Sequence, residues 1–546
     1  MLNAVTAPPV PVNEPVLGYA PGSAERAALK KRLSEMKAEG TVEIPAVIGG
    51  ERVETGRTVE VCAPHEHARL LGVGHLCGAP EVERAIAAAR AAAHDWSRMP
   101  FDERAAIFLR AADLLAGPWR QTINAATMLG QSKNAFQAEI DSACELIDFL
   151  RFNVAFAHRL YSEQPVSPGG AVWNRLEYRP LEGFVLAGTP FNFTAIAGNL
   201  PAAPALMGNV VVWKPSSTQL LAAHHTMRLF EAAGLPPGVI NLLPGDGADV
   251  GDPAIASPHF AGLHFTGSTG TFNRLWRDIG ADVGRYRSYP RIVGETGGKD
   301  FIVMHPSADP RVVATAIVRG AFEYQGQKCS AASRVYLPES RKDAVMEHVG
   351  EMLARVTMGP VEDFSNYINA VIDRRSFERI TGYIDRAKTA SDATVRFGGT
   401  SSDETGYFVA PTLIETDSPG YASMCEEIFG PVVTAYTYAD RTWEKTLKVV
   451  DETGPYALTG AIFSDDRAAL LRAADVLRDA AGNIYFNDKP TGAVVGQQPF
   501  GGARASGTND KAGSMWNLAR WVSPRTIKET FTPPTDFAYP FLDPDA

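Results

Sequence analysis

Two segments of the sequence carry residues that together could form and hydrolyse a covalent acyl intermediate. Cys329 lies in the motif Gln-Lys-Cys-Ser (327–330), and Glu295 lies upstream in the motif Gly-Glu-Thr-Gly-Gly-Lys (294–299). A thiolate is a strong nucleophile, and a carboxylate can activate the water that releases an acyl group. The alternatives are a structural cysteine and a loop acid that only faces solvent. The two motifs together favour a covalent reaction at Cys329.

A third polar residue, Asn192, could assist the same reaction. It lies in the motif Thr-Pro-Phe-Asn-Phe (189–193), directly after a short apolar run. An asparagine amide on a rigid turn can donate a hydrogen bond to a developing oxyanion, together with a backbone N–H group. Asn and Pro also make ordinary turns, which is their common use. Taken alone, the motif favours an ordinary turn.

Three further segments suit a dinucleotide. Lys214 closes a buried apolar run, and ligands bind at the carboxyl edge of strands in open α/β sheets. Residues 267–270 lie between a strand pattern and a helix pattern, where backbone donors suit a pyrophosphate. Glu427, in Glu-Glu-Ile-Phe-Gly-Pro (426–431), could accept hydrogen bonds from ribose hydroxyls. A solvated lysine and ordinary turns are the alternatives.

The pattern of the chain predicts two α/β units that position these residues. Helical periodicity comes first, at 81–96, 107–115 and 139–152. From about residue 183, continuous apolar runs alternate with helix candidates, as is typical of buried parallel strands; these runs are 184–187, 210–213, 239–243 and 262–265. A second set of strand candidates follows at 334–337, 432–436, 458–463 and 483–486.

Three segments do not fit these units. Residues 161–179 are too polar and irregular for a core helix and predict a protruding hairpin, and the extended tail after Trp521 could pair with a similar segment. Residues 1–23 contain five prolines and no Lys or Arg, which predicts an extended, poorly ordered arm. This arm resembles neither a secretory signal nor a transit peptide.

Composition excludes several classes of partner. The chain has 62 acidic and 52 basic residues, a net charge of -10, so nucleic acid and anionic membrane surfaces are poor partners. No apolar run approaches the roughly 18 residues of a membrane span. Small molecules are the expected partners.

The cysteines and histidines predict neither a disulfide framework nor a metal site. The five cysteines contain no Cys-x-x-Cys pair, which favours a reducing cytoplasm. The pairs at 65–67 and 224–225 are isolated histidines without further ligands at useful spacing, so we expect ordinary surface or helix residues and no metal.

In this order, the motifs resemble the aldehyde dehydrogenase superfamily from about residue 40 to residue 525. The most specific blocks are 295–299, 326–330 and 426–431. A narrower resemblance, to the Δ1-pyrroline-5-carboxylate dehydrogenase family, rests on 138–141, 191–196 and 496–510. That family oxidises L-glutamate γ-semialdehyde to L-glutamate in proline catabolism.

The resemblance implies a role for each matching residue. Cys329 would be the nucleophile, Glu295 the base, and Asn192 with the Cys329 backbone N–H the oxyanion donors. It implies cofactor contacts from Thr189, Lys214, Ser216, Gly267, Ser268, Thr269, Gly270, Thr271, Glu427 and Phe429. It implies substrate contacts from Phe193, Ser330, Gly492, Ala493 and Phe500, where the two aromatic side chains would sandwich the aliphatic chain and could otherwise be core residues.

The resemblance also implies the architecture. We expect an α/β aldehyde dehydrogenase fold with a Rossmann-like NAD-binding domain, an α/β catalytic domain and a small β flap for oligomerisation. The expected boundaries are an arm at 1–40, the NAD-binding domain at 41–308 with a flap hairpin at about 161–180, the catalytic domain at 309–490, a substrate-anchor loop and return at 491–520, and an oligomerisation tail at 521–546.

Several alternatives remain open at this point. NAD is expected and NADP is possible, because Ser217 stands where many relatives have an acid that repels a 2′-phosphate. The rival substrate is another carboxylate-bearing aldehyde such as succinate semialdehyde, and the rival class is an inactive relative that serves as a binding protein. We expect at least a homodimer, with no fused proline dehydrogenase domain within 546 residues.

Overall fold

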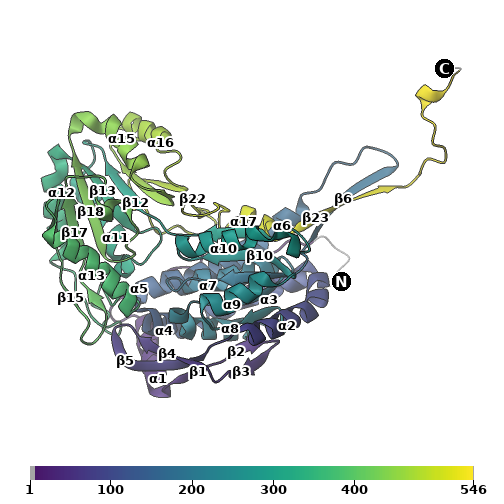
Figure 1. The fold of residues 1–546 in the computed structure, drawn as a ribbon, viewed down its shortest axis with the longest axis horizontal. Helices are drawn as coiled ribbons and strands as arrows, with labels where there is room; N and C mark the ends of the chain where they lie inside the picture. Colours follow the sequence, from purple (N-terminus) through teal and green to yellow (C-terminus); the bar gives the residue numbers. More distant parts are fainter. Residues whose placement is uncertain (1–5, 545–546) are drawn as a thin grey trace.

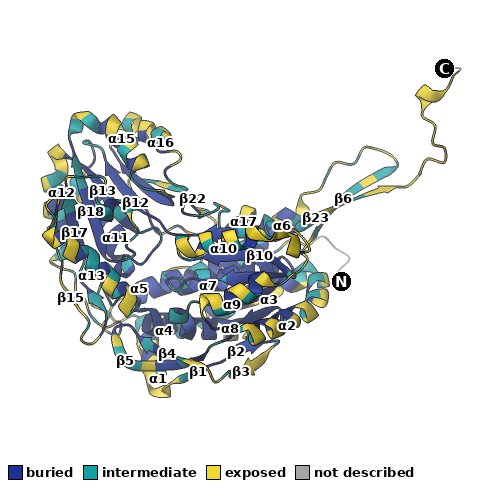
Figure 2. Cartoon of the chain, in the orientation of Figure 1, coloured by how far each residue is buried: buried dark blue, intermediate teal, exposed yellow. Residues whose placement is uncertain are grey.

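The computed structural model describes residues 6–544 and contains two seven-stranded sheets, each flanked by helices (Figure 1). Both sheets are largely buried, whereas the helices around them expose one face (Figure 2). This is the α/β architecture that the alternation of apolar runs and helix patterns predicts. No helix within the described residues has the length and apolar character needed to cross a membrane.

The first sheet forms the core of the predicted cofactor domain. Its order is β11 (Arg291–Glu295), β10 (Phe260–Thr266), β7 (Phe184–Gly188), β8 (Val210–Lys214), β9 (Ile240–Leu242), β2 (Ala46–Ile48) and β3 (Glu51–Val53). The first five strands are parallel, and β2 pairs antiparallel with both β9 and β3. The connecting helices are α7 (Thr194–Leu206), α8 (Leu220–Ala232), α9 (Gly247–Ala256) and α10 (Thr269–Ala281).

The second sheet forms the core of the other unit. Its order is β14 (Ala393–Phe397), β17 (Thr412–Thr416), β18 (Val432–Tyr438), β13 (Ala332–Pro338), β12 (Asp300–Met304), β20 (Thr459–Phe463) and β21 (Asn483–Phe486). Only β14 is antiparallel to its neighbour. The helices of this unit are α11 (Pro310–Phe322), α12 (Glu339–Leu353), α13 (Arg374–Thr389), α15 (Trp443–Glu452) and α16 (Arg467–Val476).

The expected boundary between the two units at 308/309 is too late. Strand β12 pairs with β13 and β20, so it belongs to the second sheet. The chain therefore leaves the first sheet after β11 and crosses through residues 296–299. A short apolar strand carries no local sign of which sheet it will join, which is why the sequence pattern placed it wrongly.

The N-terminal part adds helices and a small sheet around the first unit. Strands β1 (Val42–Ile44), β5 (Glu66–His75) and β4 (Thr58–Ala63) form a three-stranded sheet that the sequence pattern did not predict. The helices are α1 (Ala24–Glu39), α2 (Ala79–Arg98), α3 (Phe101–Ala116), α4 (Arg120–Gln131), α5 (Ala135–Ala138) and α6 (Glu145–Ser162), with a π-helical turn at Glu139–Cys144 before α6.

The expected arm at 1–40 differs from the structure in two ways. Residues 24–39 form helix α1, and the extended residues before it are tied to the body of the protein. Leu17 N–H donates to Glu139 Oε1 at 3.0 Å, and Tyr19 Oη donates to Glu139 Oε2 at 2.8 Å. The described part of the arm is thus extended, as its prolines predict, but packed. Residues 1–5 of this prediction lie outside the described residues.

A two-stranded ribbon projects from the body (Figure 1). Strand β6 (Val172–Arg179) pairs antiparallel along its whole length with β23 (Ser523–Thr530). This differs from the expected hairpin at about 161–180, because residues 161 and 162 end α6 and the partner strand comes from the C-terminal tail. The tail after Trp521 does pair with another extended segment, as expected, but the local pattern did not show that its partner would be β6.

Candidate active site

The loop that carries Cys329 follows α11 and has an unusual backbone. Tyr324, Gln325 and Gly326 all adopt left-handed conformations, with φ of 51°, 55° and 63°. A non-glycine residue in this region costs of order 1–3 kcal/mol, so neighbouring contacts must compensate. Gln325 Nε2 donates to Ser132 O at 2.9 Å and to Ala370 O at 2.8 Å. Buried side-chain hydrogen bonds thus fix the approach to Cys329.

Asn192 lies against this same loop. It is buried, and its Nδ2 donates to Gln327 O at 3.0 Å, two residues before the cysteine. It comes from the turn between β7 and α7, as the sequence pattern predicts. An amide N–H group therefore stands next to the loop of the predicted nucleophile.

The electrostatics of Cys329 are those of a protonated resting thiol. Burial raises the pKa of Cys329 well above its usual range, and the charges of Glu295, Asp300 and Glu427 raise it further. A thiolate here needs a proton acceptor or a nearby positive charge. Taken as a whole, residue Cys329 is half-buried.

Glu295 is a carboxyl group that burial keeps protonated at neutral pH. Burial raises its pKa to about 8, and the positive charge of Lys511 lowers it in part. Its Oε1 has no hydrogen-bond partner among the described residues. A carboxyl with a pKa near neutral and no fixed partner is well suited to exchange protons with water.

Cys329 lines a cavity of about 320 Å³ at the junction of the two units. All five predicted substrate residues line the same cavity: Phe193, Ser330, Gly492, Ala493 and Phe500. Glu295 lines a smaller cavity of about 40 Å³, and the two cavities share Glu145, Phe149, Ile196, Phe500 and Ala512. The structure thus brings together the cysteine, the acid and the predicted substrate residues.

Several hydrogen bonds and ring contacts hold the cavity wall. Ser330 Oγ lies 2.7 Å from Thr491 Oγ1, next to Gly492, which has a φ of 94° that favours glycine. Lys133 Nζ lies 4.2 Å from the centre of the Phe193 ring and pairs with Asp141. A cation over an aromatic face is attractive and holds the ring in place.

The sequence pattern missed two groups of cavity residues. Glu145 lines both cavities, and burial, with the charge of Asp141, raises its pKa well above its usual range. Asn13, Glu14 and Val16, from the N-terminal segment, line the substrate cavity as well. Glu145 opens α6 as part of a helical pattern, and the segment 13–16 belongs to no motif. Neither had a local signal of its role.

The predicted cofactor residues gather at the carboxyl ends of three neighbouring strands. Thr189 follows β7, Lys214 ends β8, and residues 267–271 follow β10. Thr189 Oγ1 accepts a hydrogen bond from Trp213 Nε1 at 3.0 Å, which joins the ends of β7 and β8. Burial lowers the pKa of Lys214. Ser216 Oγ lies 3.1 Å from Thr218 Oγ1.

Helix α10 points its N-terminus at this edge of the sheet. Ser268 caps it, accepting from Thr271 N–H at 3.3 Å, and Thr269 Oγ1 donates to Ala505 O at 3.2 Å. A side chain added at Gly270 would meet only open space, so the first turn is accessible. Accessible amide groups at a helix N-terminus bind anions such as a pyrophosphate.

Glu427 and Phe429 face this region from the second unit. Glu427 Oε1 accepts from Gly298 N–H at 3.0 Å, and burial raises its pKa. Phe429 has a φ of 56°, and its ring meets Phe191 edge-on at 5.8 Å. The predicted cofactor residues therefore come from both units, and residues 297 and 298 join Thr269 to Glu427 by hydrogen bonds.

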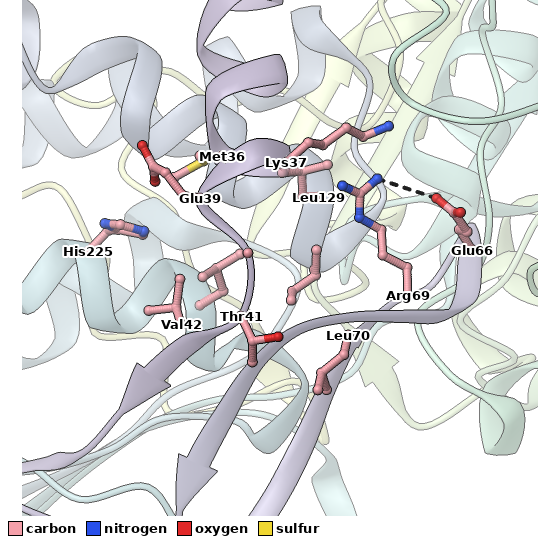
Figure 3. A pocket seen from close by; sticks show the side chains of 13 residues that line it. Met36, Lys37, Glu39, Thr41, Val42, Glu66, Arg69, Leu70, Leu129 and His225 are labelled. Carbon is pink, nitrogen blue, oxygen red and sulfur yellow. Dashed lines mark hydrogen bonds and ion pairs between the residues drawn. The ribbon is translucent and has the colours of Figure 1, made fainter.

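A second cavity, of about 420 Å³, lies between α1, β1 and β5 (Figure 3). It is larger than the cavity at Cys329 but holds none of the predicted site residues. Arg69 Nη1 in its wall donates to Glu66 Oε2 at 3.3 Å. His225 is buried here, and both ring nitrogens lack a hydrogen-bond partner among the described residues. Chemistry, rather than size, identifies the cavity at Cys329 as the candidate site.

The histidines show no metal centre. No group of three His, Cys, Asp or Glu side chains that could hold an ion occurs between residues 6 and 544. His224 and His225 lie in helix α8, as expected. His65 is buried rather than on the surface, with Nδ1 2.7 Å from Ser132 Oγ.

Comparison with known proteins identifies the family. The model of the aldehyde dehydrogenase family matches residues 52–527. The chain belongs to the aldehyde dehydrogenase family. The resemblance of the motifs and the α/β fold class are thereby confirmed, and the rival interpretation as an inactive binding protein finds no support in this aldehyde dehydrogenase.

Relatives of this aldehyde dehydrogenase carry a narrower name. The Δ1-pyrroline-5-carboxylate dehydrogenase of Agaricus bisporus is 52% identical over 98% of this chain and 97% of that protein. The crystal structure of the Mycobacterium tuberculosis Δ-pyrroline-5-carboxylate dehydrogenase bound with NAD is 56% identical, with a TM-score of 0.95 over 99% of each chain. The Thermus 1-pyrroline-5-carboxylate dehydrogenase with bound NAD is 32% identical, with a TM-score of 0.90 over 96% of this chain and 100% of that one.

Proposed function

We propose that the protein oxidises L-glutamate γ-semialdehyde, the open form of Δ1-pyrroline-5-carboxylate, to L-glutamate with NAD, as a step of proline catabolism. The observation that carries this proposal is the cavity that Cys329 shares with Phe193, Ser330, Gly492, Ala493 and Phe500. The names of relatives that match nearly the whole chain support it.

The chemistry of the cavity matches both ends of this substrate. The semialdehyde has a short aliphatic chain between its aldehyde and an α-carbon that carries a carboxylate and an ammonium group. Phe193 and Phe500 offer apolar walls for the chain, while Ser330 and the backbone N–H groups of Gly492 and Ala493 offer donors for the carboxylate. Glu145 lines the same cavity, and its carboxyl oxygens would accept hydrogen bonds from the ammonium group.

The reaction proceeds through a covalent bond to Cys329. The Cys329 sulfur attacks the aldehyde carbon while its proton passes to water, and Asn192 Nδ2 with the Cys329 backbone N–H donates to the oxyanion that forms. Bound NAD supplies the acceptor for the hydride that leaves this carbon. The resulting thioester is hydrolysed by water that Glu295 deprotonates, which releases the acid and restores the thiol.

Residues from both units would hold the cofactor. Lys214 and Ser216, with Thr189, are proposed for the adenosine side, residues 267–271 for the pyrophosphate, and Glu427 with Phe429 for the nicotinamide side. The accessible first turn of α10 supports the pyrophosphate site. Ser217, next to Ser216, carries no charge to repel a 2′-phosphate, so we propose a preference for NAD with measurable use of NADP.

The ribbon and the tail that follows it support assembly into a homodimer or larger homo-oligomer. Phe531, Phe537, Tyr539 and Phe541 are 59%, 88%, 69% and 82% exposed, which is costly for aromatic side chains in water. A second copy of the chain would cover them. Truncation after Thr530 should reduce the molecular mass measured by light scattering, and an unchanged mass would contradict this assignment.

The redox state of the cysteines indicates in which cellular compartment the protein works. All five cysteines are free, which supports a reducing environment, and we propose the cytoplasm. Cell fractionation with an antibody to the chain would test this directly, and recovery in an organelle would overturn it.

The substrate assignment is tested by a panel of aldehydes. NAD reduction by the purified protein is measured with Δ1-pyrroline-5-carboxylate, succinate semialdehyde and propanal. We expect kcat/KM for the pyrroline to be at least about a hundredfold above the others, or roughly 2.7 kcal/mol of transition-state preference. A higher kcat/KM with succinate semialdehyde would be consistent with the reaction at Cys329 but would overturn the assignment of the substrate.

A further inference from the structure

The outer wall of the substrate cavity comes from an unexpected part of the chain. Asn13, Glu14 and Val16 line the cavity, although they lie in the extended segment before α1. The loop 491–498, which carries Gly492 and Ala493, lines the same cavity next to this segment. We refer to residues 12–17 as the strap and to residues 491–498 as the anchor loop.

Asn13 joins the strap to the anchor loop through both ends of its amide. Its Nδ2 donates to Val495 O at 2.8 Å, and its Oδ1 accepts from Gln497 Nε2 at 3.0 Å. The same Nδ2 also donates to Asp148 Oδ2 in α6 at 2.7 Å. One side chain therefore fixes the anchor loop against the helix that begins with Glu145.

The anchor loop has few other constraints. Gly492, Val494, Gly496, Gln497 and Gln498 are exposed, and the hydrogen bonds within the loop are local. Gln498 Oε1 accepts from Val494 N–H at 2.9 Å, for example. Because donors to a substrate carboxylate must be held to within about half an ångström, the contact with Asn13 bears on substrate binding.

The strap itself is fixed independently of Asn13. Glu14 pairs with Arg120 at 2.6 Å and with Arg151 at 2.8 Å, and its backbone N–H donates to Asp148 Oδ1 at 2.7 Å. Tyr19 and Leu17 bind Glu139 further along. Loss of the Asn13 amide should therefore release the anchor loop while the strap stays in place.

We propose that the strap completes the substrate cavity and that Asn13 is a positioning residue, which holds the anchor loop so that Gly492 and Ala493 can bind the carboxylate of the substrate. This inference rests on the proposed function, since it concerns the carboxylate end of the same substrate. Asn13 sets the KM for carboxylate-bearing aldehydes and leaves the chemistry at Cys329 unchanged.

The test separates kcat from KM in the full chain. For Asn13→Ala, we expect the KM for Δ1-pyrroline-5-carboxylate to rise about tenfold, since two hydrogen bonds to the anchor loop are lost. The kcat of this variant should stay within about twofold of the wild-type value. The kcat/KM for propanal, which has no carboxylate, should not change.

Two further variants make the result specific. Gln497→Ala removes one of the two hydrogen bonds from an exposed side chain, so it should raise the same KM by a smaller factor without affecting folding. Tyr19→Phe removes a contact between the arm and the body that does not reach the anchor loop, so its KM should match the wild type.

The outcomes distinguish this inference from the proposed function. An unchanged KM in Asn13→Ala, or equal losses with propanal and the pyrroline, would overturn the positioning role. A wild-type protein that prefers neither carboxylate-bearing aldehyde over propanal would instead overturn the proposed function, before any variant is measured.

Discussion

The two loops that meet at the substrate cavity are built in opposite ways. The loop before Cys329 is buried, carries two strained non-glycine residues, and is fixed by side chains that reach two other segments, 131–132 and 370–372. The anchor loop is largely exposed apart from Val495, and the hydrogen bonds that join it to other segments include those of Thr491 and Asn13. The first loop is held by many buried contacts and the anchor loop by few.

This difference indicates that the first loop serves the reaction and the anchor loop serves substrate recognition. A nucleophile must keep the same geometry for every aldehyde, and a buried, strained loop provides that geometry at a cost in stability. A substrate-anchoring loop must fit one class of substrate, and contacts from side chains alone can change it without disturbing the core. Variants of the residues up to Cys329 should affect all aldehydes, and variants of the anchor loop or of its contacts should affect only aldehydes with a carboxylate.

The largest expected effect is that of Cys329→Ala. Loss of the nucleophile should lower kcat/KM by about 10⁴-fold or more with the pyrroline and propanal alike, because no covalent intermediate can form. Steady-state NAD reduction measures this. Cys62→Ala, a thiol in β4 away from both cavities, should match the wild type. Residual activity of Cys329→Ala with one aldehyde only would contradict the proposal that the loop of Cys329 serves all aldehydes equally.

The next effect is that of Glu295→Gln, for which we expect turnover to fall about 10²- to 10³-fold. Hydrolysis of the thioester should slow while its formation continues, so stopped-flow traces should show a burst of reduced cofactor followed by a slow phase.

The pH dependence follows from the raised pKa of Glu295. The carboxylate that acts as base is present only above its pKa of about 8, so wild-type turnover should rise from pH 7 and level off above that value. Turnover of Glu295→Gln should lack this inflection. The same inflection in both proteins would assign it to another group.

The sequence predicted the parts of the site that depend on local motifs. Cys329, Glu295 and Asn192 lie in short blocks that combine a reactive residue with the turn residues that present it, and the structure gathers these blocks. The three strands that carry Thr189, Lys214 and residues 267–271 at or just after their carboxyl ends followed from continuous apolar runs. In each case, the signal and the structure that it predicts span only a few residues.

The remaining parts depend on contacts between distant residues. Strand β12 joins the second sheet, and β6 pairs with β23, because of neighbours that no local pattern specifies. Asn13 and Glu145 reach the cavity in the same way, one from an extended arm and one from the first turn of a helix. The sequence marks them only as a polar residue between prolines and an acid on a helix.

The smallest expected effect tests a hydrogen bond that joins the two loops. Ser330, directly after Cys329, lies 2.7 Å from Thr491 at the start of the anchor loop. For Ser330→Ala, we expect kcat/KM for the pyrroline to fall about fivefold, the value of one hydrogen bond near 1 kcal/mol, with no change for propanal. Thr491→Val and the double variant complete a cycle. If Ser330 acts by holding the anchor loop, the double variant should lose no more than either single variant. If Ser330 binds the carboxylate directly, the losses in kcat/KM of Ser330→Ala and Thr491→Val should multiply in the double variant. The position of the anchor loop would then depend on Asn13 more than on Ser330.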